Sequence, residues 1–212
     1  MNKPLAGFIP FSYPDYPRKY IDKFTQDSIK TLRSLGLELV TTEPVIVYKD
    51  AARALDDIRG KDVDFVVALV LSWLEAPNVI AVLKEFSNKP ILLWSHTMFK
   101  EKGEWLTLGP MPGAGVLRET LEQMGFKFKF VWGMPDEERV KREIESFSRA
   151  AYAASRLAKS KIGLLGYASM GMYTATFDHV SIRNKIGPEI DQLDQYVLIQ
   201  KISEVKEDEV EE

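Results

Sequence analysis

Three side chains are candidates for binding a substrate, namely Arg18, Trp73 and His96. Each lies shortly after a stretch predicted to form a strand, and ligands of parallel α/β sheets bind beyond the carboxyl ends of the strands. The indole of Trp73 can stack on the apolar face of a sugar, with a core or interface role as the alternative. Arg18, near Tyr13 and Tyr16, can reach a hydroxyl or an anion, or can be merely solvated. His96 can contact a ligand or have a purely structural role.

Most kinds of covalent and metal catalysis lack their usual residues in this sequence. There is no cysteine, which excludes a thiolate nucleophile, a disulfide and thiolate metal sites. The only two histidines, His96 and His179, have no partner at metal-ligand spacing. Glu75 is the one acid well placed after a buried strand, where a helix N-terminal charge is the commoner role. The residues by themselves therefore form no recognised catalytic or metal-binding motif.

The most glycine-rich segment is Gly109–Gly115, GPMPGAG. Glycines before a helix can present backbone N–H groups to an anion. The segment lacks the third glycine of GxGxxG, and the phosphate-binding loop GxxxxGK[ST] is absent from the chain. The alternative is a turn that lets Val116 and Leu117 pack.

Composition is that of an ordinary globular protein with one large or two small domains. Of the 212 residues, 45% are apolar and 28% charged, and the net charge is −3. No basic stripe is present, so nucleic acid is not expected as a partner. The longest apolar run, Val63–Leu74, is interrupted by Asp64 and Ser72 and is too short to span a bilayer. We predict a cytoplasmic protein without a membrane partner.

Strands and helices are predicted to alternate along the first 158 residues. The strands are Leu5–Phe11, Leu37–Thr42, Val63–Leu71, Pro90–Ser95 and Phe126–Trp132. One predicted helix follows an N-cap at Asp15, and two more cover 49–59, with Ala52, Leu55 and Ile58 inward, and 75–86. Residues 110–124 are predicted to be a loop that leads into a helix, and a long helix is predicted from Asp136 to about 159. Residues 96–109 are predicted to be a long connection. This order predicts an α/β fold, a doubly wound parallel sheet of about five strands that is flavodoxin-like or Rossmann-like.

Residues 159–212 are predicted to begin a second, incomplete α/β domain. Ile162–Tyr167 has the composition of a buried strand, followed by a turn at Ala168–Met172 and a helix near Asp178 and His179. A short strand at 189–193 and a helical turn at 196–202 follow. The acidic end, SEVKEDEVEE, is either a solvated tail or the first turn of another helix.

Three stretches of this chain resemble the N-terminal part of the L-fucose/L-arabinose isomerase family. The first is Val67–Glu75 with the later Lys89–His96. The second is Phe130–Gly133 with a long helix that ends at Arg149–Arg156. The third is Lys161–Gly187. The similarity spans nearly the whole chain and rests on the order and spacing of diffuse motifs.

The resemblance implies that the complete protein interconverts aldoses and ketoses with a divalent metal, usually manganese. It implies that the two carboxylates and the histidine that hold Mn²⁺ lie beyond residue 212, so this chain is expected to be inactive alone. It also implies a homo-oligomer in which Arg18 and Trp73 reach the active site of a neighbouring subunit. One alternative is a free-standing flavodoxin-like or Rossmann-like module that binds a nucleotide or metabolite. Another is a pure assembly domain.

Overall fold

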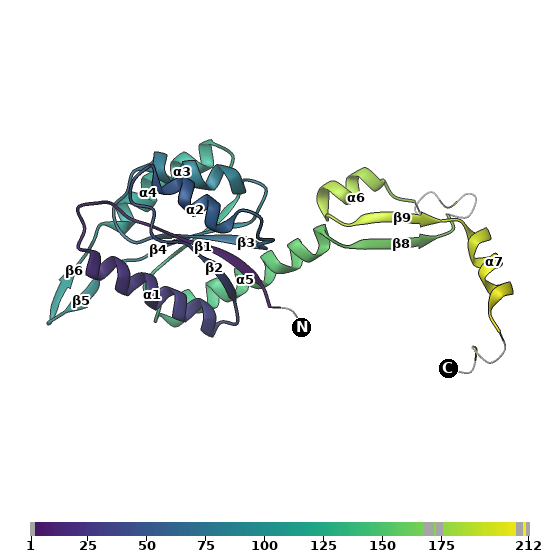
Figure 1. Cartoon of the computed structure of the whole chain (residues 1–212), viewed down its shortest axis with the longest axis horizontal. Coiled ribbons are helices and arrows are strands. Elements are labelled where there is room, and N and C mark those ends of the chain that lie inside the picture. The colour runs from purple at the N-terminus through teal and green to yellow at the C-terminus, as the bar shows by residue number, and fades with distance from the viewer. Residues whose placement is uncertain (1–2, 168–171, 173–175, 207–209, 211–212) are drawn as a thin grey trace. The chain divides into compact units, whose positions relative to one another are not determined.

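The computed structural model describes residues 3–167, 172, 176–206 and 210. The chain divides into two compact units, Met1–Tyr152 and Ala153–Glu212, each described here by itself. The first unit is a layered α/β domain and the second contains a small two-stranded sheet (Figure 1). None of the described helices is long and apolar enough to cross a membrane.

A five-stranded parallel sheet in the order β2-β1-β3-β4-β7 forms the centre of the first unit. Its strands are β1 (Leu5–Phe11), β2 (Glu38–Thr41), β3 (Phe65–Val70), β4 (Ile91–Ser95) and β7 (Phe128–Trp132). All six residues of β3 are buried, as expected for a valine-rich central strand covered on both faces. β7 lies at the edge of the sheet, as predicted, and the predicted fold class is confirmed.

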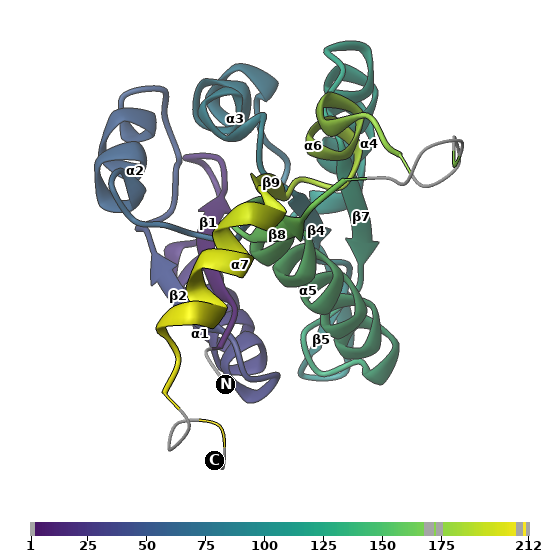
Figure 2. The same cartoon turned by 90° about the vertical axis from the view of Figure 1, so that its right-hand side faces the viewer.

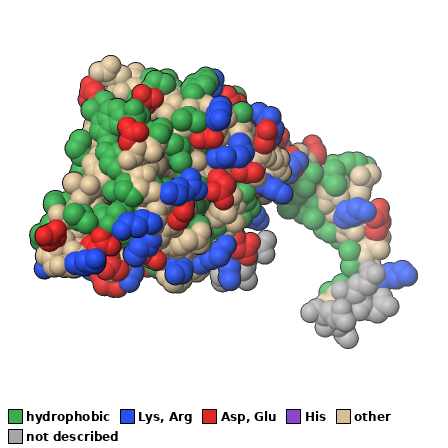
Figure 3. Space-filling view, turned by 60° about the vertical axis from the view of Figure 1, so that its left-hand side comes forward, with side chains coloured by type: hydrophobic (Ala, Val, Ile, Leu, Met, Phe, Trp, Pro, Cys, Tyr) green, Lys and Arg blue, Asp and Glu red, His purple; other side chains and the backbone are tan. Residues whose placement is uncertain are grey.

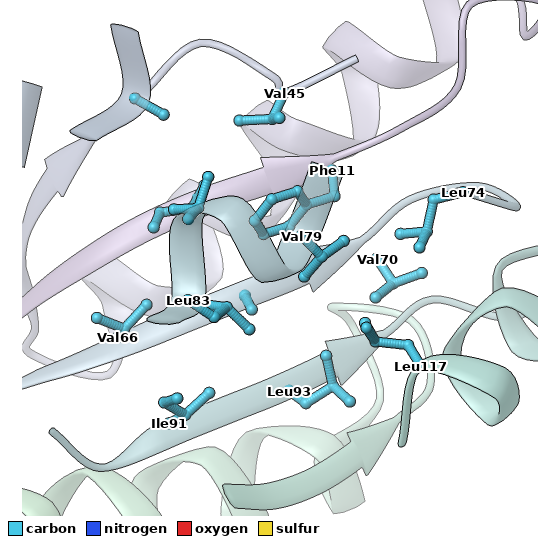
Figure 4. Close-up of a cluster of buried hydrophobic side chains, with 14 of the residues drawn as sticks. Phe11, Val45, Val66, Val70, Leu74, Val79, Leu83, Ile91, Leu93 and Leu117 are labelled. Carbon is cyan, nitrogen blue, oxygen red and sulfur yellow. The ribbon is translucent and has the colours of Figure 1, made fainter. Parts of the chain in front are cut away.

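Helices cover both faces of this sheet (Figure 2). One face packs against α2 (Asp50–Ile58), α3 (Ala76–Leu83), which continues into the 3₁₀ turn η1 (Lys84–Phe86), and α4 (Pro110–Gln123). The other face packs against α1 (Arg18–Ser34) and α5 (Glu138–Ala158). Phe11, Val79, Leu93 and Leu117 interdigitate in the first of these cores (Figure 4). Each such side chain stabilises the fold by roughly 1.5–3 kcal/mol through burial.

Two local predictions within these helices are wrong. α1 begins directly after Pro17 without a side-chain cap, so Asp15 is not its N-cap. The ring of Pro17 fixes its φ at a value that suits entry into a helix, and the helix begins at the next residue. In α2, Ala52 is exposed, whereas Ala51 and Ala54 are buried. Ile58 is buried and Leu55 packs against the core, both as predicted, so the prediction for this helix is wrong only at Ala52.

The connection predicted at residues 96–109 contains a β-hairpin that the sequence did not reveal. Its strands are β5 (Phe99–Glu101) and β6 (Glu104–Leu106), which pair antiparallel. The two-residue turn between them, Lys102 and Gly103, has φ angles of 51° and 90°. Both angles are left-handed, which is typical of the tightest hairpin turns. Strands of three residues are too short to show alternation in the sequence.

The second unit pairs β8 (Lys161–Leu165) in parallel with β9 (Glu189–Leu193), and contains α6 (His179–Lys185) and α7 (Gln195–Glu204). The prediction that the first of these strands is buried is wrong, because Ile162 and Leu165 are 48% and 56% exposed. Two strands and a short helix cannot enclose both faces of a sheet. Asp178 caps α6 by accepting a hydrogen bond from the Ser181 amide at 2.7 Å.

Two predicted segments of the second unit fall largely outside the described residues. The turn at 168–172 is described only at Met172, and the acidic end is not described at 207–209 and 211–212. Ser203 and Glu204, with which the acidic end begins, form the last turn of α7.

Candidate functional site

The carboxyl ends of β1 and β3 lie side by side, but the chain leaves them toward opposite faces of the sheet. β1 leads into α1 on one face, and β3 leads into α3 on the other. Such a topological switch point is where open α/β sheets bind their ligands. Ser12 directly follows β1, Ser72 lies two residues after the last residue of β3, and the hydroxyl oxygens of the two serines lie 3.0 Å apart. The candidate site is therefore built around the loops that continue from these two serines.

Trp73 lies at the switch point with 41% of its surface exposed. The ring of Tyr13 meets its indole edge-on, with ring centroids 5.1 Å apart and planes at 80°. The Trp73 backbone N–H donates a hydrogen bond to the Leu108 carbonyl at 2.8 Å. Large aromatic side chains are normally buried, so a half-exposed indole with a fixed backbone is suited to contact a ligand.

Arg18 is the first residue of α1, at the same end of the sheet. Its guanidinium pairs with Asp22 at 2.7 Å and with Glu43, which follows β2, at 3.4 Å. The Arg18 side chain is 53% exposed, and an ion pair at this exposure stabilises the protein by about 0–1 kcal/mol. An incoming anion can therefore compete with these carboxylates at little cost. Charges of both signs are interspersed over the face of the first unit seen in Figure 3.

His96 is enclosed in the core and does not face the switch point. Only 2% of the residue is exposed, and its ring packs edge-on against Phe24 and Trp94. Its Nε2 lies 2.9 Å from the Ser28 hydroxyl, and its Nδ1 is buried without a hydrogen-bond partner among the described residues. Burial lowers the pKa of His96 to about 3, although the charge of Asp27 opposes this shift. In this conformation the neutral imidazole is not accessible to a substrate.

The glycine-rich segment Gly109–Gly115 forms the first turns of α4 rather than a phosphate loop. A Cβ on Gly113 would lie 3.3 Å from the Trp73 Cα, so the absence of a side chain lets the helix pack closely on this backbone. Two of the first helical residues are prolines, which have no N–H to offer an anion. The packing interpretation is favoured, although only Leu117 is buried and Val116 is 67% exposed.

A wide hollow of about 820 Å³ lies between α1, the β5–β6 hairpin and the loop before α5. Its lining includes the apolar side chains Tyr20, Phe24, Met98, Phe99, Trp105 and Met134. Lys23 and Asp27 at its edge form an ion pair at 2.7 Å. Sequence reasoning missed this hollow because one of its walls is the hairpin that was not predicted. The only signal was the Lys102-Gly103 pair between two short aromatic stretches.

No group of three or more histidine, cysteine, aspartate or glutamate side chains is placed to hold a metal ion in the part of the chain that the structure describes. Glu75 is exposed at the start of α3 and makes no side-chain cap. The described residues therefore do not fit a manganese site.

Curated proteins named sulfoquinovose isomerase are similar to this chain. The protein from Priestia aryabhattai is 19% identical over 195 residues, which are 92% of this chain and 43% of the relative. The protein from Alkalicoccus urumqiensis is 20% identical over 201 residues, which are 95% of this chain and 45% of the relative. The protein from Clostridium sp. (strain MSTE9) is 20% identical over 210 residues, which are 99% of this chain and 46% of the relative.

Over most of its length, the chain is similar to proteins named as sugar isomerases. It spans less than half the length of the curated relatives it matches. No family model matches it. The similarities thus support an isomerase family but do not single out the L-fucose/L-arabinose isomerases that its motifs resemble.

Proposed function

We propose that this chain is the N-terminal portion of an aldose–ketose isomerase and supplies substrate contacts and subunit contacts, but not the reaction chemistry. The observation that carries the proposal is the half-exposed Trp73 held at the topological switch point. The sugar isomerases named above, which match the chain over 92–99% of its residues, support a sugar as the ligand.

The substrate that these residues suit best is an aldose with an anionic substituent. Sulfoquinovose, named for the relatives, carries a sulfonate. The apolar face of a sugar ring can stack on Trp73, and a sulfonate can accept hydrogen bonds from the guanidinium of Arg18. L-fucose or L-arabinose, suggested by the sequence motifs, would use Trp73 in the same way but would leave Arg18 with only hydroxyl partners.

The metal that such isomerases use, manganese by family resemblance, would be bound by residues outside this chain. The described residues offer no ligand set for it, so the role proposed here is limited to binding and orienting the sugar and excluding water. In an oligomer, Arg18 and Trp73 would close over the active site of a neighbouring subunit. Exposed apolar residues of the second unit, such as Leu165, Leu193 and Ile199, are available for contacts with another chain.

An assay of the purified chain for turnover tests the proposal that the chain contributes to substrate binding but does not catalyse the reaction. The chain is incubated with Mn²⁺ and sulfoquinovose, L-fucose or L-arabinose, and ketose formation is followed by NMR. We expect no turnover from this chain and rapid turnover from a complete relative assayed in parallel. Robust isomerisation by this chain would contradict the proposal. Light scattering on the same sample measures whether the chain self-associates. A strict monomer would count against the proposed subunit contacts.

The strand order favours a second candidate function. The order β2-β1-β3-β4-β7 is that of flavodoxin-like proteins, which bind a nucleotide cofactor at the switch point between the first and third strands. The chain would then be a free-standing module that binds a nucleotide or metabolite. A thermal-shift screen separates the two, because a multi-degree stabilisation by FMN or NAD and none by sugars would favour the module.

A further inference from the structure

The hydroxyl of Ser72 joins the two loops of the switch point. The residue is completely buried. Its oxygen lies 3.0 Å from the Ser12 hydroxyl, accepts a hydrogen bond from the Tyr13 amide at 3.1 Å and donates to the Trp73 carbonyl at 2.7 Å. A serine hydroxyl has one donor and two acceptor positions. Because its proton goes to the Trp73 carbonyl, Ser12 must be the donor in the pair of serines, and every position on Ser72 is used.

The Trp73 backbone is thereby held from two sides. Its carbonyl accepts from Ser72, and its N–H donates to the Leu108 carbonyl at 2.8 Å. α4 presses against the same peptide at Gly113, where a Cβ would come within 3.3 Å of the Leu74 nitrogen. The indole alone is left half-exposed. The ring contact between Tyr13 and Trp73 does not by itself require these backbone hydrogen bonds. An indole that must keep one orientation for a ligand does require a fixed backbone.

We propose that Ser72 is a positioning residue that fixes the orientation of the Trp73 indole for sugar binding. The inference rests on the proposed function for the identity of the ligand, but not for the orientation itself. A platform held in its binding orientation loses less conformational freedom when the sugar arrives, so affinity depends on a hydroxyl that never touches the ligand. The same hydrogen bonds keep Tyr13 in its edge contact with Trp73.

Fluorine NMR of the 5-fluorotryptophan-labelled chain tests this role directly. The four tryptophans give four resonances, and Trp73→Phe assigns the one that matters. We expect Ser72→Ala to shift and broaden the Trp73 resonance and to weaken sugar binding about tenfold, equivalent to about 1.4 kcal/mol. Ser72→Thr, which keeps the hydroxyl, is expected to restore much of both signals.

Ser95→Ala is the matched control. Ser95 is also fully buried and is the last residue of β4, the strand next to β3. Its hydroxyl donates to the carbonyl of the next residue, His96, at 3.0 Å. We expect it to lower the melting temperature as Ser72→Ala does and to perturb Trp94 while leaving Trp73 in place. An unmoved Trp73 resonance in Ser72→Ala, or an equal movement in Ser95→Ala, would overturn the proposal.

Two outcomes separate this inference from the proposed function. If Ser72→Ala moves the Trp73 resonance but no sugar perturbs it in the wild type, the positioning role stands and the sugar assignment fails. If a sugar perturbs Trp73 equally well in both proteins and the resonance is unmoved, the sugar assignment stands and the positioning role fails. If Ser72→Ala does not fold, Ser12→Ala takes its place, because it removes one of the three hydrogen bonds of Ser72. We then expect a smaller movement of the Trp73 resonance, and the absence of any movement would overturn the proposal.

Discussion

The ring of Tyr13 meets the indole of Trp73 edge-on, with centroids 5.1 Å apart and planes at 80°. The two residues lie 60 positions apart in the sequence and follow neighbouring strands, β1 and β3. Their contact joins the two sides of the switch point above the buried serine pair. The positive edge of one ring against the negative face of the other makes this geometry favourable.

Tyr13→Ala is predicted to release Trp73 from this contact. The lost aromatic pair should lower the free energy of unfolding by about 0.5–1.5 kcal/mol and weaken sugar binding. Tyr13→Phe is the control, because it keeps the ring and should change neither quantity appreciably. Chemical denaturation and calorimetric sugar titration measure the two effects. A Tyr13→Ala protein that binds sugar as tightly as the wild type would show that the contact has no part in binding.

Two glycines of α4 are predicted to respond oppositely to alanine. Gly115 has open space where a Cβ would be, so Gly115→Ala should raise the free energy of unfolding by about 0.5–1 kcal/mol through helix propensity. At Gly113 the Cβ would press on the Trp73 and Leu74 backbone, which lies in a bonded loop and cannot easily yield. Gly113→Ala should therefore be destabilising and should shift the Trp73 fluorescence. Equal stabilisation by both substitutions would contradict the close packing.

Arg18→Gln is predicted to separate binding from stability. The Arg18 ion pairs are exposed, so the free energy of unfolding should change by less than about 1 kcal/mol. Affinity for a sulfonated sugar should fall about tenfold or more, because a charge-assisted contact is lost, whereas affinity for a neutral sugar should change little. Lys23→Gln breaks a similar ion pair with Asp27 on the same helix and should change neither the affinity for the sulfonated sugar nor that for the neutral sugar. Titration of all three proteins with both sugars decides the outcome.

His96 is predicted to make stability depend on pH. Its pKa is about 3 in the folded protein and 6.5 in its ordinary state, so between these values the unfolded chain binds the additional proton. The contribution of His96 to the free energy of unfolding is therefore fully present above about pH 6.5. It is lost as the pH drops below this value, by up to ~1.4 kcal/mol per pH unit. His96→Gln should flatten this slope in urea titrations between about pH 6 and about pH 5. His179→Gln, which removes an exposed histidine, should not.

The sheet could be predicted from sequence because its strands carry strong local signals. The first strand was predicted at the residues where β1 lies, Leu5–Phe11, and the valine-rich run from Val63 contains the central strand. The rule that ligands bind at strand carboxyl ends directed attention to Trp73, which the structure finds half-exposed at the switch point. These inferences need only the composition of one segment at a time.

The remaining features depend on contacts between distant segments. His96 is enclosed by α1, through Ser28, which lies 68 residues earlier in the chain, and no local pattern reports this. The hydrogen bond between Ser12 and Ser72 likewise spans 60 residues. β8 was predicted to be buried because its residues are apolar, but burial requires neighbouring strands and helices that the described part of the second unit does not provide.

The central claim is that Trp73 and Arg18 form a sugar-binding surface at the switch point. The measurement that tests it most directly is a fluorine NMR titration of the 5-fluorotryptophan-labelled chain with sulfoquinovose, with FMN as the competing ligand. The account predicts that sulfoquinovose moves the Trp73 resonance alone, with a millimolar dissociation constant that is higher in Arg18→Gln. A Trp73 resonance that responds to FMN and to no sugar would contradict it.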